Sequence, residues 1–225
     1  MRLSIIIPAF NEESALPATL HSLRRQGAEE IIVVDGGSLD ATLEVARPLA
    51  DRVLTGAHGR AGQMNLGATQ ATGDALLFLH ADCTLQAGAL DEIPHWLSRP
   101  SIAAGCFRMT VPAGNLIYRS IDACASARVR LFGIVYGDQG LFLRRDTFDR
   151  AGGFPDLRLM EDVFLSLKLR RLGRIAVARQ RIFVSPRRWQ RVGIIRQTLR
   201  NWMLTGLAAG GVNPDRLARY YPPIR

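Results

Sequence analysis

Two alternating patterns in the first half of the chain constrain its fold most. Short apolar runs, many of them rich in β-branched residues, predict four strands, at Leu3–Ile7, Glu30–Val34, Arg52–Thr55 and Ala75–Leu79. Between them, apolar residues recur at helical spacing, as at Leu16, Leu20 and Leu23. Strands that read as continuous apolar runs are buried on both faces, which is typical of a parallel sheet covered by helices. We therefore expect an α/β fold with a mostly parallel sheet.

The second half of the chain is less regular. It predicts two further strands and three helices, at Ala104–Val111, Leu141–Leu143, Leu116–Phe132, about Glu161–Leu172 and about Val192–Leu207. No internal repeat or low-complexity linker interrupts it. We expect one domain over residues 1–225, with two lobes that meet near residue 110 and a basic helical segment from about residue 191.

Composition excludes several classes of protein. Of the 225 residues, 48% are hydrophobic and 22% charged, which argues against disorder. No apolar stretch approaches the roughly 18 residues of a membrane span. The three cysteines lack C-x-x-C spacing, which argues against a disulfide framework or a structural zinc site. The first residues lack the features of a signal peptide, so we expect a cytoplasmic protein.

The positive charge is concentrated near the end of the chain. From Leu165 onward there are 14 basic residues and one acid, whereas the preceding residues carry a net charge of −4. A basic C-terminal quarter predicts an anionic or phosphate-rich partner. The alternative is a solvated basic surface in an arginine-rich protein, which the single lysine supports equally well.

Candidate ligand-binding residues follow the predicted strands, because ligands of such sheets bind beyond the carboxyl ends of the strands. Asp35 ends one apolar run and precedes two glycines. Its carboxylate can accept hydrogen bonds from a base or a ribose hydroxyl, and the glycines let the backbone approach a ligand. The alternative is that Asp35 or Ser38 caps the following helix. We favour the ligand role for Asp35 and the cap for Ser38.

A second candidate follows the fourth predicted strand. Side chains at i and i+2 of an extended segment point the same way, so His80 and Asp82 can converge on one Mg²⁺ or Mn²⁺ ion. A histidine beside a sheet is also a common structural hydrogen-bonding group.

Two more candidates lie in the second half. Adjacent helical residues diverge, so only one carboxylate of Glu161 and Asp162 is expected to face a substrate atom; acids in a first helical turn also offset the helix dipole. Arg187 and Arg188 can clamp a diphosphate beside Trp189, which offers a stacking surface. An RNA-binding patch has a similar composition, but one aromatic residue gives little support for stacking on bases.

In this order, the segments resemble family-2 glycosyltransferases of the GT-A fold, in particular a short soluble bacterial subgroup. The resemblance runs from Ser4 to about Trp189. It rests on these segments: Pro8-Ala9-Phe10-Asn11-Glu12-Glu13, Asp35-Gly36-Gly37-Ser38-Leu39-Asp40, Arg60-x-Gly62-Gln63-x-Asn65-x-Gly67, Gly73-Asp74, His80-Ala81-Asp82, Glu161-Asp162 and Arg187-Arg188-Trp189. Each motif alone has low specificity, whereas the order of the motifs along the chain is specific for this family.

The resemblance implies an inverting glycosyl transfer from a nucleotide-diphosphate sugar, with UDP-sugars favoured and GDP-sugars as the alternative. Asp162, next to Glu161, would be the general base, and Asp82 with His80 would hold Mn²⁺ or Mg²⁺. About 1–110 would bind the donor and about 111–190 the acceptor. The implied donor contacts are Pro8, Ala9, Glu12, Asp35, Arg60, Gln63, His80, Ala81, Asp82, Arg187, Arg188 and Trp189.

The sequence departs from the family pattern at two places. His80 stands where the family usually has the first carboxylate of D-x-D, which leaves the metal affinity and the choice of metal open. Ser185 replaces the glutamine of the Q-x-x-R-W element, which argues against a processive polysaccharide synthase.

The acceptor is not predicted by the sequence. Gly137, Asp138 and Gln139 are expected to line its cleft with the helix at Leu116–Phe132. The last helix has apolar residues on one face and Arg196, Gln197 and Arg200 on another. Such a helix can lie on the inner face of an anionic membrane, or pack on the domain or on a second subunit. A monomer and a homodimer are both open.

Two other functions remain as alternatives. A basic module that binds nucleic acid or a membrane surface without catalysis explains the C-terminal charge but leaves Asp35, Asp82 and Asp162 unexplained, so a nucleic-acid partner is not favoured. A sugar-phosphate nucleotidyltransferase would have a glycine-rich basic loop after the first strand, where this chain has Asn11-Glu12-Glu13.

Overall fold

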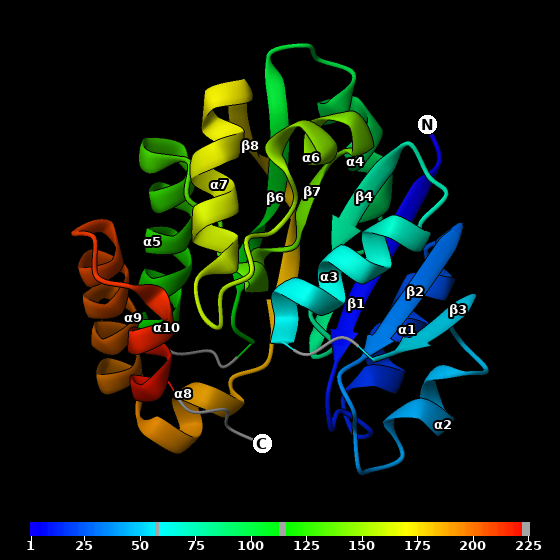
Figure 1. Ribbon diagram of the computed structural model, residues 1–225, viewed down its shortest axis with the longest axis horizontal. Helices are drawn as coiled ribbons and strands as arrows, with labels where there is room; N and C mark the ends of the chain where they lie inside the picture. Colours follow the sequence, from blue (N-terminus) through cyan, green and yellow to red (C-terminus); the bar gives the residue numbers. More distant parts are fainter. Residues whose placement is uncertain (57–58, 113–115, 222–225) are drawn as a thin grey trace.

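The structure is a computed structural model that describes residues 1–56, 59–112 and 116–221. One eight-stranded sheet runs through it in the order β3-β2-β1-β4-β7-β6-β8-β5, with helices on both faces (Figure 1). The strands are β1 (Leu3–Ala9), β2 (Glu30–Asp35), β3 (Arg52–Thr55), β4 (Ala75–Phe78), β5 (Cys83–Leu85), β6 (Ile102–Thr110), β7 (Leu141–Arg144) and β8 (Arg174–Val184).

The sheet has a parallel half and a mixed half. Strands β3, β2, β1 and β4 are parallel, β7 is antiparallel to both of its neighbours, and β6 and β8 are parallel again. The α/β class and the mostly parallel sheet predicted from the sequence are confirmed. Strands β5 and β8 were not predicted from the sequence. The burial pattern of β8 is irregular along its eleven residues, so its sequence does not form one apolar run.

The helices include those that the apolar spacing predicts and four that it does not. The helices are α1 (Leu16–Arg25), α2 (Thr42–Ala46), α3 (Gly59–Gln70), α4 (Ala89–Leu97), α5 (Leu116–Phe132), α6 (Arg145–Ala151), α7 (Glu161–Leu172), α8 (Arg187–Val192), α9 (Ile194–Ala209) and α10 (Pro214–Leu217), with 3₁₀ turns η1 (Gly137–Gln139) and η2 (Ala218–Tyr220). The four that the spacing does not predict are α4, α6, α8 and α10. No helix within the described residues is both long and apolar enough to span a bilayer.

Alternate residues of the central strands pack into two different cores. In β1, Ile5 and Ile7 belong to the core that contains the leucines of α1, whereas Ile6 packs with Met64 of α3 and Leu165 of α7 on the other face. Both faces of the sheet are therefore buried, as the continuous apolar runs predict. On the α3 face the packing is close: a Cβ on Gly67 would lie 2.4 Å from Cγ2 of Ile6. Helix α3 therefore packs tightly against the middle of β1.

Candidate active site at the carboxyl ends of the strands

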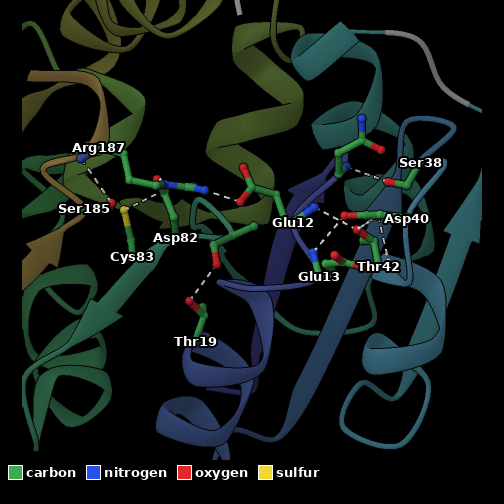
Figure 2. Close-up of polar contacts among 12 residues, drawn as sticks. Glu12, Glu13, Thr19, Ser38, Asp40, Thr42, Asp82, Cys83, Ser185 and Arg187 are labelled. Atoms are coloured by element: carbon green, nitrogen blue, oxygen red, sulfur yellow. Dashed lines mark hydrogen bonds and ion pairs between the residues drawn. The ribbon is translucent and has the colours of Figure 1, made fainter. Parts of the chain in front are cut away.

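The loops after β1 and β2 form one hydrogen-bonded unit. Ala9 is paired with Asp35 at the ends of the two strands. Beyond them, Ser38 Oγ accepts a hydrogen bond from the Asn11 amide at 2.8 Å, and Thr42 Oγ1 accepts one from the Glu12 amide at 2.7 Å (Figure 2). Asn11 adopts a left-handed backbone conformation (φ 54°), which asparagine tolerates better than most residues. The unit holds Glu12 at the sheet edge.

Asp35, the last residue of β2, is buried next to these two loops. It is 1% exposed, and its carboxylate accepts hydrogen bonds from the amides of Gly37 and Ser38 at 2.9 and 3.0 Å and from the Ser38 hydroxyl. The carboxylate therefore shapes the glycine turn. Asp35 retains acceptor capacity, because each carboxylate oxygen can accept more than one hydrogen bond. Its contact with a donor nucleoside stays a prediction.

Helix α3 supplies Gln63 and Arg60. Gln63 is 4% exposed, and its Nε2 donates to the carbonyl oxygens of Ala9 and Val34, each at 2.7 Å. These bonds engage the side-chain donors of Gln63, so in this structure it positions the strand ends. The half-exposed Arg60 pairs with buried Glu161, Nε to Oε1 at 2.9 Å, and this neighbour raises the pKa of Arg60.

The segment after β4 forms the candidate metal site. His80, Asp82 and Cys83 each offer one ligand atom, and these atoms lie within 4.8 Å of one another. Burial, followed by the nearby Arg60, lowers the pKa of His80 to about 4, so the imidazole is neutral and able to ligate. Asp82 is a hard oxygen ligand of the kind that Mn²⁺ and Mg²⁺ prefer, whereas a thiol suits softer metals. Asp82 and His80 therefore fit the predicted ion.

Arg187 lies across the donor side of the site. One of its guanidinium nitrogens is 2.9 Å from Glu12 Oε2 and 2.9 Å from Asp82 Oδ2 (Figure 2). Arg187 comes from α8, far along the chain from both carboxylates. The sequence prediction placed these three residues in one site, and the structure brings them together. A cationic group thus bridges two carboxylates at the place predicted for a diphosphate and its metal.

The acceptor side is built around Gly137. Its amide donates to Asp162 Oδ2, and a Cβ at this position would lie 2.5 Å from Nε2 of His80 and 3.4 Å from Asp162 Oδ2. Asp162 and His80 therefore flank one glycine. Glu161, by contrast, is 2% exposed and paired with Arg60; burial raises its pKa, and Arg60 opposes that rise. Only Asp162 of the acidic pair reaches toward Gly137, as expected for neighbours on a helix.

The other predicted acceptor residues differ in their surroundings. The Oδ1 atom of Asp138 is buried and has no hydrogen-bond partner among the described residues, and burial raises the pKa of Asp138 to about 6. Gln139 is fully buried and accepts a hydrogen bond from Arg128. Gln139 therefore supports the turn, and its predicted acceptor contact is untested. Arg128 also stacks on Tyr136, with its Cζ 3.4 Å from the ring centroid. Neither residue was predicted from the sequence, because no motif marks them.

The remaining predicted donor residues contribute backbone or packing. Pro8 and Ala81 are buried, and the Ala81 carbonyl accepts from Thr19 Oγ1 at 2.8 Å (Figure 2). Trp189 is 7% exposed and packs edge-on against Tyr118 at 6.2 Å. It is thus part of the core beneath α8, not an open stacking surface. Arg188 lies 4.3 Å above the ring of Tyr221.

The fold matches two solved structures. The mannosyltransferase PcManGT from Pyrobaculum calidifontis, solved with GDP-Man and Mn²⁺, superposes with a TM-score of 0.64 at 22% identity over 79% of this chain and 55% of its own. TarS 1-349 of S. aureus, solved with UDP-GlcNAc, gives a TM-score of 0.65 at 20% identity over 82% and 58%. The architecture is therefore of the GT-A type.

Sequence comparison gives the family. Residues 4–154 match the model of glycosyl transferase family 2, and the chain belongs to that family. A PGL/p-HBAD biosynthesis glycosyltransferase of Mycobacterium bovis is 44% identical over 165 residues, 67% of this chain. The O-antigen chain rhamnosyltransferase RfbN of Salmonella typhimurium is 28% identical over 195 residues, 77% of this chain. The chain spans 62% of the length of each of these two relatives.

Proposed function

We propose that this protein transfers a sugar from a nucleotide-diphosphate sugar to an acceptor hydroxyl, with inversion at the anomeric carbon and with a divalent cation. One observation carries the proposal: the Arg187 guanidinium joins Glu12 and Asp82, His80 lies next to Asp82, and His80 and Asp162 both lie against Gly137. Carboxylates and an arginine at the carboxyl ends of strands suit a diphosphate and its metal. The donor and metal in the PcManGT complex and the donor in the TarS complex support the same class of donor.

The proposed reaction is a single displacement. Asp162 Oδ2 takes the proton of the acceptor hydroxyl as the hydroxyl oxygen bonds to the anomeric carbon. The bond from that carbon to the β-phosphate oxygen breaks, and the nucleoside diphosphate leaves with the bonding electrons. General-base catalysis of this kind contributes roughly 10²–10⁴-fold. The Gly137 amide holds Asp162 in place for the transfer.

The donor side would stabilise the leaving group. Asp82 and His80 would hold Mn²⁺ or Mg²⁺, which when bound supplies positive charge to the diphosphate oxygens. Arg187 can turn from Glu12 and Asp82 to the phosphates, since its side chain is 44% exposed. Asp35 would bind the nucleoside at the glycine turn. UDP-sugars are favoured as donors, with GDP-sugars as the alternative.

The test separates donor binding from catalysis. A thermal-shift panel of UDP, GDP, CDP and dTDP, each with and without Mn²⁺ or Mg²⁺, identifies the donor nucleotide; a ligand at 100 times its Kd stabilises the fold by about 2.7 kcal/mol. With that donor, Asp162→Asn should reduce donor turnover by roughly 10²-fold or more and keep the nucleotide shift. If Asp162→Asn loses the shift as well, Asp162 is structural. If no nucleotide shifts the folded wild type, the proposal is wrong.

A further inference from the structure

Helix α9 presents its apolar side chains outward. Residues three and four apart share one face of a helix, and here they form a stripe along α9. The stripe consists of Ile195 (67% exposed), Leu199 (57%), Trp202 (51%), Met203 (55%) and Leu207 (41%). Figure 1 shows α9 at the edge of the molecule. Exposed apolar stripes of this kind mark interaction surfaces.

The inner face of α9 is held by polar contacts. Gln197 is fully buried, and its Nε2 donates to Asn201 Oδ1 at 2.6 Å and to the Tyr221 hydroxyl at 3.3 Å. Thr205 shares a hydrogen bond of 2.7 Å with the Tyr136 hydroxyl. The sequence placed Gln197 on a polar face without saying which way that face turns. In the structure Gln197 faces the protein. Its bond to Asn201 lies within α9, but rotating the helix to hide the stripe would break the bonds to the Tyr221 and Tyr136 hydroxyls.

The surroundings of the stripe are basic. No acidic residue occurs between Asp162 and Asp215, a segment that includes all of α8 and α9. Arg196 is exposed and, by helical geometry, lies next to Leu199, on the side of the helix that also carries Met203 and Leu207. Arg216 and Arg219, just beyond α9, are also exposed. An apolar stripe bordered by arginines is complementary to a surface with an apolar interior and anionic head groups.

We propose that α9 lies on an anionic lipid bilayer, with its apolar stripe at the boundary between head groups and acyl chains and Arg196 at the phosphates. A second copy of the chain is a less favourable occupant, because pairing through α9 would bring two basic C-terminal segments together. The indole of Trp202 suits the bilayer boundary, since it has an apolar body and a polar N–H.

The bilayer would then lie near the acceptor side of the site. Leu204 and Ala208, on the inner face of α9, share a core with Leu159, Met160 and Val163, which flank Glu161 and Asp162. If the proposed function holds, an acceptor carried in or on the membrane would meet Asp162 from this side. Binding of α9 to a lipid surface does not depend on this encounter between acceptor and Asp162.

The test is vesicle flotation of the whole chain without nucleotide or metal, so that failure of the proposed catalysis does not affect it. We expect binding to vesicles of phosphatidylcholine with about one quarter phosphatidylglycerol and little binding to phosphatidylcholine alone. The double variant Leu199→Gln/Trp202→Gln should bind at least about tenfold more weakly, and Arg196→Gln about fivefold. The matched control is Leu131→Gln on α5, which removes an exposed leucine elsewhere and should keep wild-type binding.

Two further readouts keep the proposal falsifiable. Tryptophan emission of the wild type should shift to the blue on addition of the anionic vesicles, and Trp202→Phe should abolish the shift even if the double variant fails to fold. Equal binding by the double variant and the wild type would overturn the proposal. The proposal would also be overturned if light scattering without lipid showed a dimer of the wild type and a monomer of the double variant. The stripe would then be an interface between two copies of the chain.

Discussion

Arg187→Gln is expected to strengthen metal binding at Asp82 in the absence of nucleotide. A divalent cation at the proposed site would compete with the Arg187 guanidinium for the same carboxylate, because a guanidinium nitrogen is 2.9 Å from Asp82 Oδ2. The same nitrogen is 2.9 Å from Glu12 Oε2, so the arginine neutralises two acids at once. Removing it takes a positive charge away from both carboxylates, which favours the binding of a cation.

The size of the effect follows from the exposure of the pair. The Arg187 side chain is 44% exposed, so water screens the interaction, and an exposed ion pair contributes about 0.2–1 kcal/mol. Loss of the Asp82 pair should therefore raise the affinity for Mn²⁺ by up to about fivefold. Donor binding should change the other way, because a charge-assisted hydrogen bond to a phosphate contributes about 1.5–3 kcal/mol. The wild type must first break its Arg187 ion pairing to make this bond, and that cost is subtracted from the free energy of the bond. We therefore expect the affinity of the variant for the nucleoside diphosphate to fall by about tenfold.

The assay is a titration of free Mn²⁺ by electron paramagnetic resonance, followed by calorimetry of the nucleoside diphosphate at saturating Mn²⁺. Arg191→Gln is the matched control, since it removes one positive charge from the same helix and should leave both constants near the wild-type values. Metal affinity that is unchanged or reduced in Arg187→Gln would refute the competition. So would an equal gain in Arg191→Gln, which would make the effect one of net charge.

Two other variants test the support of the site. Gln63→Leu leaves the carbonyls at the ends of β1 and β2 without their donor and should lower the free energy of unfolding by about 1–3 kcal/mol in denaturant titrations, whereas Gln70→Leu, at the exposed end of the same helix, should not. Asp138 has its pKa raised by burial from 3.8 to about 6, so the folded state binds its proton more tightly and loses stability as pH rises through this range. Asp138→Asn should thus stabilise the protein at pH 7 relative to the wild type by up to about 3 kcal/mol, and much less at pH 4; an equal difference at both pH values would contradict this reasoning.

The sequence predicted the donor side of the fold better than the acceptor side, and the reason is physical. Strands buried on both faces, such as Ile31–Val34, are marked by composition alone, and polar residues directly after them must lie at one sheet edge. Strand β8 has exposed and half-buried residues along its length, so its sequence does not show a continuous apolar run. Residue Arg128 joins the site through its contacts with Tyr136 and Gln139, which are tertiary contacts that no spacing predicts.

The roles of individual side chains were harder to predict than their positions. Gln63 and Trp189 belong to motifs that suggest donor contacts, yet both side chains are buried. Gln63 donates hydrogen bonds to two backbone carbonyls, and Trp189 packs against Tyr118. A motif shows which residue types occur together in the sequence. It does not distinguish a residue that binds the ligand from a residue that only positions its neighbour. The outward turn of α9 likewise depends on tertiary contacts, such as the bonds from Gln197 and Thr205 to the hydroxyls of Tyr221 and Tyr136.

Helix α3 shows how one element can place both sides of the site. Through Gln63 it fixes the ends of β1 and β2 on the donor side, and through Arg60 it pairs with Glu161, next to Asp162. Asn65 adds a reciprocal pair of hydrogen bonds with the backbone of Phe154, at 2.8 and 3.0 Å. The two halves that the sequence divides near residue 110 are therefore joined through the helix that carries the donor motif. A displacement of α3 would change the distance between the metal ligands and the proposed base, so substitutions on its buried face should affect turnover more than nucleotide affinity.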